Sequence, residues 1–189
     1  MSAQAPDGHA GRFDTLDAAE QYTGYSRVLL ETVRTPDGRE VVREIVDHDD
    51  AVAVVALTDA DEVVLLRQYR QPVRGHLLEI PAGTLDVEGE EPEVAVRREL
   101  AEEAQLQATD LEHLTTFHNS AGWSTERTHL YLARGVSPAP LPEGFVPKDE
   151  EADMEIVYLD FEVAVRQARQ GEIADAKTAL GLLLAAERR

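Results

Sequence analysis

The sequence has no cysteine, few aromatic residues and no long apolar run. Without cysteine, the chain cannot form disulfide bonds, thiolate metal sites or a cysteine nucleophile, and the cytoplasm is the default location. A membrane-spanning helix needs roughly 18 apolar residues, and no segment approaches that length. Residues 1–14 are polar and lack the pattern of a secretory signal. We therefore expect a cytoplasmic protein with no membrane partner and a flexible N-terminal tail over 1–14.

Basic residues are also scarce. The chain carries 18 lysines and arginines against 37 aspartates and glutamates, which gives a formal net charge of −19. Nucleic-acid binding depends on clustered basic side chains, so we expect no nucleic-acid partner. The acidity suits a cation-binding site, although a well-solvated surface gives the same composition.

The order of the predicted elements indicates the fold class. The turn sequence TPDG joins two strands, 26–34 and 39–47, as a β-hairpin. Further strands are predicted at 51–58, 62–70, in HLLEIPAG up to a Pro-Ala-Gly turn, and within 110–120, 127–136 and 154–161. One helix is predicted at 92–104, and two more are separated by Gly171. This order is typical of an α+β fold or a mixed α/β/α sandwich, not of regular βαβ repeats.

The helix predicted at 92–104 is acidic on one face. Glu99, Glu102 and Glu103 lie three and four residues apart, where like charges repel each other. The compensating positive charge can come from Arg97 and Arg98, as on many surface helices, or from a divalent cation. Carboxylate oxygens at this density suit Mg²⁺ or Mn²⁺. The helix alone does not decide between these interpretations.

The segment that contains this helix resembles the Nudix box of the Nudix hydrolase superfamily. The resemblance is carried by a glycine, a glutamate and an Arg-Glu-Leu-Ala-Glu-Glu run: Gly83, Glu90, Arg98, Glu99, Leu100, Glu102 and Glu103. Two positions differ from the family pattern. Gly83 stands one residue further from Glu90 than usual. Gln105 replaces the second glycine, so it has to adopt the helix-ending conformation that glycine takes more easily.

Four further stretches resemble the ADP-ribose pyrophosphatase subgroup: LLRQYRQPV with LLEIPAG, SAGWSTE, DEEADMEIVYL and GEIADAKTALGLLL. The resemblance covers roughly residues 26–184. It implies a Nudix-type α/β/α sandwich with a mixed β-sheet over 48–189, and metal-dependent hydrolysis of ADP-ribose to AMP and ribose 5-phosphate. Two alternatives stay open. The chain can hydrolyse another nucleoside diphosphate sugar or dinucleotide, or it can be a non-catalytic nucleotide-sugar-binding module, against which the intact acids argue.

The resemblance also implies a divalent-metal site, with Mg²⁺ as the expected ion and Mn²⁺ as the alternative. Glu99 and Glu103 are implied as the principal ligands, and the backbone carbonyl of Ala82 as the main-chain ligand. Glu102 is implied as a further ligand that takes part in catalysis. Arg98 is expected to pair with a carboxylate of the box and to fix its loop.

The remaining site residues are implied in the same way. A base for the attacking water is expected from the acidic loop before the strand at 154–161, at Glu151 or, second, Glu150, although both can be ordinary solvated acids. Arg70 is expected to reach the diphosphate, with Arg67 on the opposite face of the strand as the alternative. The other expected substrate-binding residues are Arg43, Glu79, Trp123 and Glu126.

The N-terminal strands, 15–47, raise the question of assembly. The resemblance implies a homodimer in which these strands of one subunit complete the substrate site of the other. The sequence itself indicates only that a hairpin needs a surface to pack on.

Overall fold

The computed structural model of the protein describes residues 13–146 and 153–188. Its internal contacts divide the chain into two units. The first contains the residues up to Asp49 together with Ser120–Glu126, and the second contains the rest. In the described part of the chain, no helix has the length and apolar character needed to cross a membrane.

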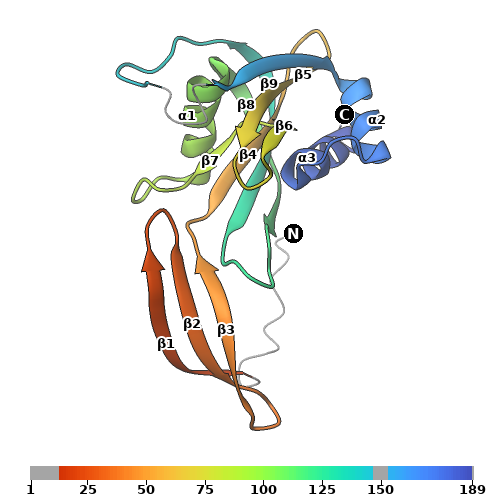
Figure 1. The fold of residues 1–189 in the computed structure, drawn as a ribbon. Coiled ribbons are helices and arrows are strands. Elements are labelled where there is room, and N and C mark those ends of the chain that lie inside the picture. Colours follow the sequence, from red (N-terminus) through yellow and green to blue (C-terminus); the bar gives the residue numbers. More distant parts are fainter. Residues whose placement is uncertain (1–12, 147–152, 189) are drawn as a thin grey trace. The chain divides into compact units, whose positions relative to one another are not determined.

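The first unit is an antiparallel sheet of three strands in the order β1-β2-β3 (Figure 1). The strands are β1 (Asp14–Thr23), β2 (Arg27–Arg34) and β3 (Glu40–Asp47). The predicted hairpin is therefore confirmed, and β1 adds a third strand at its edge. Gly38 closes the turn with a φ of +83°, which glycine adopts without strain.

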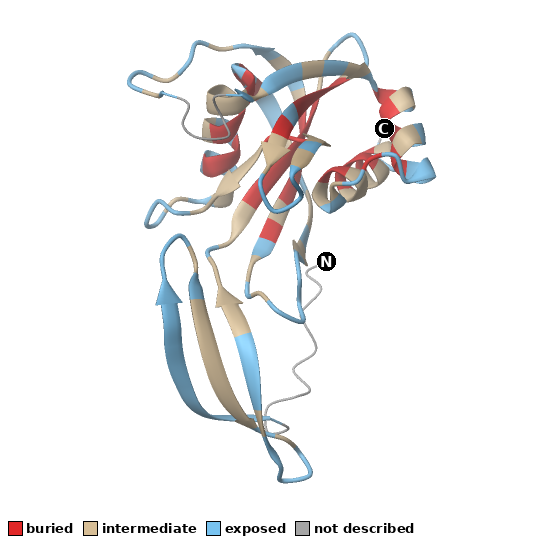
Figure 2. Ribbon diagram, viewed as in Figure 1, coloured by how far each residue is buried: buried red, intermediate tan, exposed pale blue. Residues whose placement is uncertain are grey.

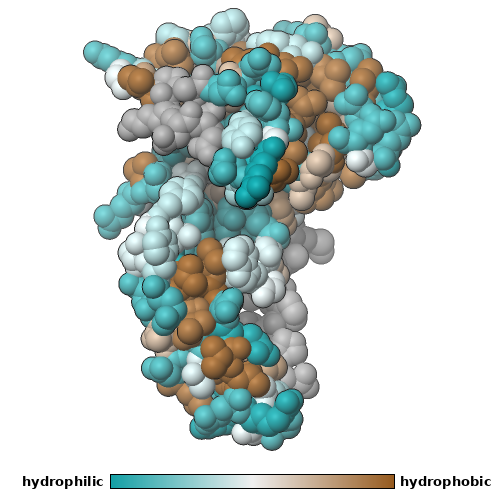
Figure 3. Space-filling model, in the orientation of Figure 1, coloured by the Kyte–Doolittle hydropathy of each residue, from teal (hydrophilic) through white to brown (hydrophobic). Residues whose placement is uncertain are grey.

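No described residue of the first unit is buried (Figure 2). All of β1 is exposed, and the apolar side chains of β2 are only partly covered. Apolar side chains also appear on the visible face of this sheet in Figure 3. Tyr22 is 60% exposed and Val42 is 57% exposed. This sheet therefore has no hydrophobic core of its own among the described residues.

The second unit contains a mixed seven-stranded sheet in the order β10-β5-β4-β9-β8, with β6 beside β5 and β7 beside β4 (Figure 1). Only the β4–β9 pair is parallel. The strands are β4 (Ala51–Leu57), β5 (Glu62–Arg70), β6 (Gly75–Glu79), β7 (Ala82–Thr84), β8 (Leu106–His118), β9 (Arg127–Pro138) and β10 (Glu155–Asp160).

The predicted Pro-Ala-Gly turn after Glu79 is wrong, because the chain changes its strand partner there. β6 pairs with β5, and β7 then pairs with β4. Ile80 and Pro81 connect the two strands. Ile80 donates its backbone N–H to the hydroxyl of Thr178 at 2.8 Å, and proline has no N–H to donate. The residues expected to turn instead extend along the sheet.

Helices cover both faces of this sheet. α1 (Pro92–Ala104) packs on one face, and α2 (Phe161–Gln170) and α3 (Ala176–Ala186) pack on the other. Strand β4 shows why: Val52 and Val54 join the core beneath α1, whereas Ala53 and Val55 join the core beneath α2 and α3. The predicted α/β/α sandwich is confirmed.

Candidate active site

The acidic face of α1 is held against the backbone of β7. Glu99 is buried, with 7% of its surface exposed. Gly83 lies so close to the Glu99 carboxyl group that a Cβ atom on Gly83 would overlap it. Gly83 therefore leaves a space in the fold that the Glu99 carboxyl fills. At the other end of the helix, Gln105 ends α1 in the left-handed conformation with φ 53°, as predicted.

Arg98 bonds three of the neighbouring acids. Its Nη1 donates to Glu99 at 2.5 Å and to Glu102 at 3.2 Å, and its Nη2 donates to Glu90 at 2.9 Å. The predicted pairing of Arg98 with carboxylates of the box is confirmed. Arg97 does not share this role, because it donates to the backbone carbonyl of Ala108 at 2.5 Å. The hydrogen bond with Glu90 and the nearby carboxylates raise the pKa of Arg98.

The Glu99 carboxyl group has a raised pKa. Burial raises its pKa to about 7, against the opposing effect of Arg98, and the charges of Glu102 and Asp86 add to the rise. A carboxylate in such a position is costly to ionise unless further positive charge approaches it. Glu103, one helical turn along, accepts the backbone N–H of Ala82 at 2.8 Å.

These acids fit a hard divalent cation by their chemistry. Carboxylate oxygens are the ligands that Mg²⁺ and Mn²⁺ prefer, and the Glu99 carboxyl is fixed beneath Gly83. Within residues 13–146 and 153–188, no three acids converge tightly enough to hold an ion as they stand. In this arrangement, Arg98 donates to Glu99 and Glu102, and the Ala82 N–H donates to Glu103.

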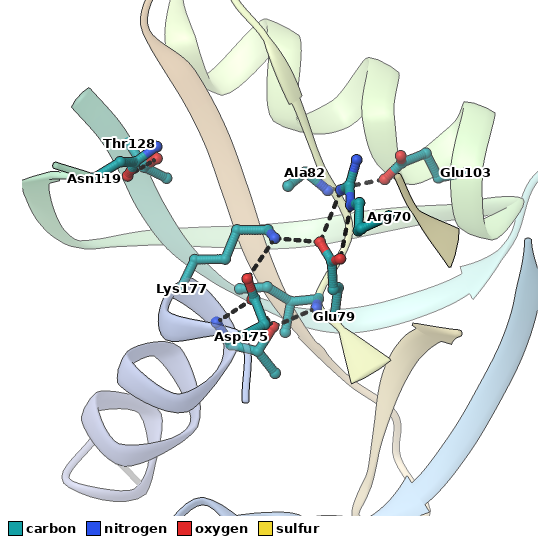
Figure 4. A network of polar contacts seen from close by, with 10 residues as sticks. Arg70, Glu79, Ala82, Glu103, Asn119, Thr128, Asp175 and Lys177 are labelled. Carbon is teal, nitrogen blue, oxygen red and sulfur yellow. Dashed lines mark hydrogen bonds and ion pairs between the residues drawn. The ribbon is translucent and has the colours of Figure 1, made fainter. Parts of the chain in front are cut away.

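A second charged network lies beside the acidic face (Figure 4). Arg70, at the end of β5, donates Nε and Nη2 to the two oxygens of Glu79, each at 2.8 Å. Lys177, in the first turn of α3, also donates to Glu79 and to Asp175 at 3.0 Å. Glu103 contributes to the raised pKa of Arg70, after Glu79 itself. A held guanidinium therefore lies next to the acidic helix.

The pKa of Glu79 depends on its burial and on these two cations. Burial alone raises the pKa of Glu79, but Arg70 and Lys177 outweigh it, so that the pKa falls below its ordinary value. Glu79 is 2% exposed. It is therefore a buried, ionised carboxylate that faces two cations.

The other predicted site residues are distributed over the chain. Arg67 extends to Glu155 on β10, at 3.5 Å, and not to Glu79. Arg43, Trp123 and Glu126 belong to the first unit, and their substrate-binding roles stay predictions. The predicted bases Glu150 and Glu151 lie outside the described residues. The main-chain role of the Ala82 carbonyl and the direct substrate contact of Glu79 also remain predictions.

The contribution of α3 to this network was not predicted from the sequence. Asp175 caps this helix and accepts the backbone N–H of Thr178 at 2.9 Å. The run Asp-Ala-Lys-Thr was a signal for such a cap, because Asp is favoured immediately before a helix. Its lysine gave no local sign of a partner 98 residues away.

The fold and this site together define a class of protein. A mixed sheet between helices, with an acidic helical turn beside a fixed guanidinium, is an α/β/α module suited to a cation and a phosphate group. The family model of the NUDIX domain matches residues 47–179. The chain belongs to the NUDIX domain family.

Individual proteins resemble the chain over most of its length. It is 37% identical over 172 residues to an ADP-ribose pyrophosphatase of Mycobacterium tuberculosis, covering 90% of this chain and 82% of the relative. It is 35% identical over 156 residues to a methanol dehydrogenase activator of Bacillus methanolicus, covering 82% of each. The crystal structure of an ADP compounds hydrolase superposes with a TM-score of 0.80 at 22% identity, covering 93% of both chains, which shows a shared fold.

Proposed function

We propose that this protein hydrolyses the diphosphate bond of ADP-ribose, giving AMP and ribose 5-phosphate, with Mg²⁺ as its metal ion. The observation that carries the proposal is the position of the Arg70 guanidinium, which is fixed on Glu79 and lies beside Glu103 on the acidic face of α1 (Figure 4). A diphosphate needs both kinds of partner: carboxylates that hold cations, and a cation that binds phosphate oxygens directly. The similarity to an ADP-ribose pyrophosphatase supports ADP-ribose as the substrate.

The acids of α1 are the residues that would hold the metal. Glu99 and Glu103 are the principal ligands, with Glu102 and the carbonyl of Ala82 beside them. A bound divalent ion neutralises negative charge on phosphate oxygens and lowers the pKa of a water molecule. Gly83 leaves room for the Glu99 carboxyl.

The positively charged residues have separate tasks. Arg98 keeps the neighbouring carboxylates apart and oriented, since it bonds Glu90, Glu99 and Glu102. Arg70 offers N–H groups to the diphosphate, because one edge of its guanidinium is already fixed on Glu79. The base that accepts a proton from the attacking water is proposed to be Glu151, with Glu150 as the second candidate.

The test is a panel of nucleoside diphosphate compounds incubated with Mg²⁺, with products separated by chromatography. We expect ADP-ribose to be turned over well above ADP-glucose and GDP-mannose, with AMP and ribose 5-phosphate as the products. A preference for another compound would change the proposed substrate but not the proposed hydrolysis of a diphosphate bond. Binding without turnover of any compound would identify a nucleotide-sugar-binding module instead.

A pair of variants on α1 makes this test specific to the site. Glu103→Gln removes a predicted metal ligand, so we expect kcat to fall by about a hundredfold or more. Glu93→Gln makes the same charge change in the exposed first turn of the helix and should retain activity. Equal activities of the two variants would remove the acidic face from the mechanism.

We propose in addition that the chain forms a homodimer through the sheet of the first unit. Its exposed apolar side chains and the absence of any buried residue among those described support this. Val42→Lys changes an exposed residue, so it should leave the monomer folded and shift sedimentation equilibrium toward the monomer. A wild-type chain that sediments as a monomer at micromolar concentration contradicts the dimer. The cytoplasmic location stays a prediction.

A further inference from the structure

We propose that Lys177 is a positioning residue for diphosphate binding, acting on Arg70 through Glu79. This inference rests on the proposed function, because it assigns Arg70 to the diphosphate. Lys177 comes from the start of α3, on the face of the sheet opposite α1. Its ammonium group shares the buried Glu79 carboxylate with Arg70, and this carboxylate links it to the guanidinium that we assign to the diphosphate (Figure 4).

The hydrogen bonds connect Lys177 to Glu79, and Glu79 to Arg70. Both oxygens of Glu79 are engaged by Arg70, and one of them is also engaged by Lys177. The Glu79 side chain is 3% exposed and that of Lys177 is 17% exposed, whereas that of Arg70 is 39% exposed. Arg70 is therefore the member that solvent and a ligand can reach. Glu79 holds Nε and Nη2 of Arg70, so we assign the Nη1 side of the guanidinium to a phosphate oxygen.

The first turn of α3 is hydrogen-bonded to the backbone directly after Glu79. Asp175 accepts N–H and O–H of Thr178, at 2.9 Å and 2.5 Å, and it accepts Lys177 at 3.0 Å. The hydroxyl of Thr178, which is fully buried, accepts the backbone N–H of Ile80 at 2.8 Å. Ile80 directly follows Glu79. The closed ring of contacts fixes Lys177 and Glu79 relative to each other, and thereby fixes the edge of Arg70 that Glu79 holds.

The charges explain what Lys177 contributes. Without Lys177, the full negative charge of Glu79 would face Arg70, and an incoming anion would meet a neutral ion pair. Lys177 divides its charge between Glu79 and Asp175, so part of the Glu79 charge is compensated from the side of α3. Arg70 then retains more positive potential toward the acidic helix, where a diphosphate and its cations are proposed to bind.

The experiment is a double-mutant cycle on Lys177 and Arg70. Lys177→Met, Arg70→Gln and the double variant are compared by kcat and KM for ADP-ribose with Mg²⁺. The same proteins are titrated calorimetrically with ADP-ribose in EDTA, which reports binding without turnover. Lys177→Gln keeps a hydrogen-bond donor without the charge. Arg169→Met, at an exposed position of α2, removes one positive charge elsewhere and serves as the control.

We expect Lys177→Met to raise KM and the Kd for ADP-ribose by about tenfold, with a smaller change in kcat. Lys177→Gln should give the same loss, and Arg169→Met none. In the Arg70→Gln background, Lys177→Met should cause no further change, because its effect passes through Arg70. Thermal melting identifies any variant that does not fold, and Lys177→Gln then carries the cycle.

Two results would overturn the inference. Additive losses in the double variant would show that Lys177 acts independently of Arg70, as a residue needed only for stability would. Wild-type affinity in both Lys177 variants would show that Arg70 needs no such support. A wild-type chain that binds ADP-ribose through Arg70 and Lys177 without hydrolysing it would refute the proposed function and retain this inference.

Discussion

The two units of this chain differ in how each sheet is covered. In the second unit, strands such as β4 and β5 bury side chains on both faces, beneath α1 on one side and beneath α2 and α3 on the other. In the first unit, β1, β2 and β3 are just as regular, but none of their residues is buried. Regular backbone pairing therefore does not by itself indicate a stable unit, because most of the stabilisation comes from apolar burial.

The two units also differ in how exposed their ion pairs are. The second unit contains buried and half-buried charge networks, such as Glu99 with Arg98 and Glu79 with Arg70. The ion pairs of the first unit are mostly exposed, as in Arg39 with Asp37. Groups with fixed geometry and altered pKa values are what a catalytic site requires. The second unit therefore holds the candidate site, and the partner surface on the first unit stays a proposal.

The largest expected effect compares a leucine from each unit. Leu65→Ala removes a fully buried side chain of β5 and should lower the free energy of unfolding by about 2–5 kcal/mol. Leu30→Ala removes a half-buried side chain of β2 and should cost less than about 1 kcal/mol in dilute protein. Urea unfolding measures both.

The comparison of these leucines becomes sharper at higher protein concentration. If the sheet of the first unit is covered by a second copy, the cost of Leu30→Ala grows as the dimer forms, whereas that of Leu65→Ala stays constant. Equal and concentration-independent losses would contradict the difference between the units.

The second effect compares a glycine from each unit. Gly83→Ala places a methyl group where the Glu99 carboxyl lies. The end of a flexible side chain can move away, so we expect a nearly unchanged melting temperature and a fall in kcat/KM of about a hundredfold. Gly38→Ala meets no atom but keeps a φ of +83°, so it should cost about 1 kcal/mol of stability and leave kcat/KM unchanged.

The reverse pattern, with lost stability in Gly83→Ala and lost activity in Gly38→Ala, would mean that the acidic helix is structural. Circular dichroism melts and initial rates on the same preparations decide between the two patterns.

The features that were predictable from the sequence depend on local chemistry. The bounds of α1 follow from Pro92 at its start and from the position of Gln105 at its end, and both were assigned correctly. The pairing of Arg98 with Glu102 follows from their i,i+4 spacing on the helix. Each of these signals lies within a few residues of the feature that it predicts.

The features that were missed depend on long-range contacts. Strand β7 occupies a predicted turn, because pairing with β4 outweighs the local preference of Pro-Ala-Gly. The bond from Lys177 to Glu79 joins residues 98 positions apart, and neither neighbourhood indicates the other. Only the fold brings α3 to the end of β6.

The smallest expected effect is a pH dependence, measured on one carboxylate from each unit. Glu79→Gln breaks a buried pair, which in general costs about 3–5 kcal/mol. Arg70 is partly exposed and Lys177 keeps Asp175, so we expect a loss of about 1–2 kcal/mol at pH 7. Asp37→Asn, in the exposed turn of the first unit, should behave as the wild type at every pH, because solvent screens its charge.

The sign of the dependence follows from the lowered pKa of Glu79. Such a carboxyl stabilises the fold fully above its unfolded pKa, near 4.5, and loses that contribution as the pH falls through the lower folded value. The gap between wild type and Glu79→Gln should therefore be constant from pH 7 to about 5 and shrink below about 4. Urea unfolding at these pH values measures it. If the free energies of unfolding of wild type and Glu79→Gln still differ by the same amount at pH 3, protonation of Glu79 has not removed its contribution. The loss in Glu79→Gln would then come from packing that the amide disturbs.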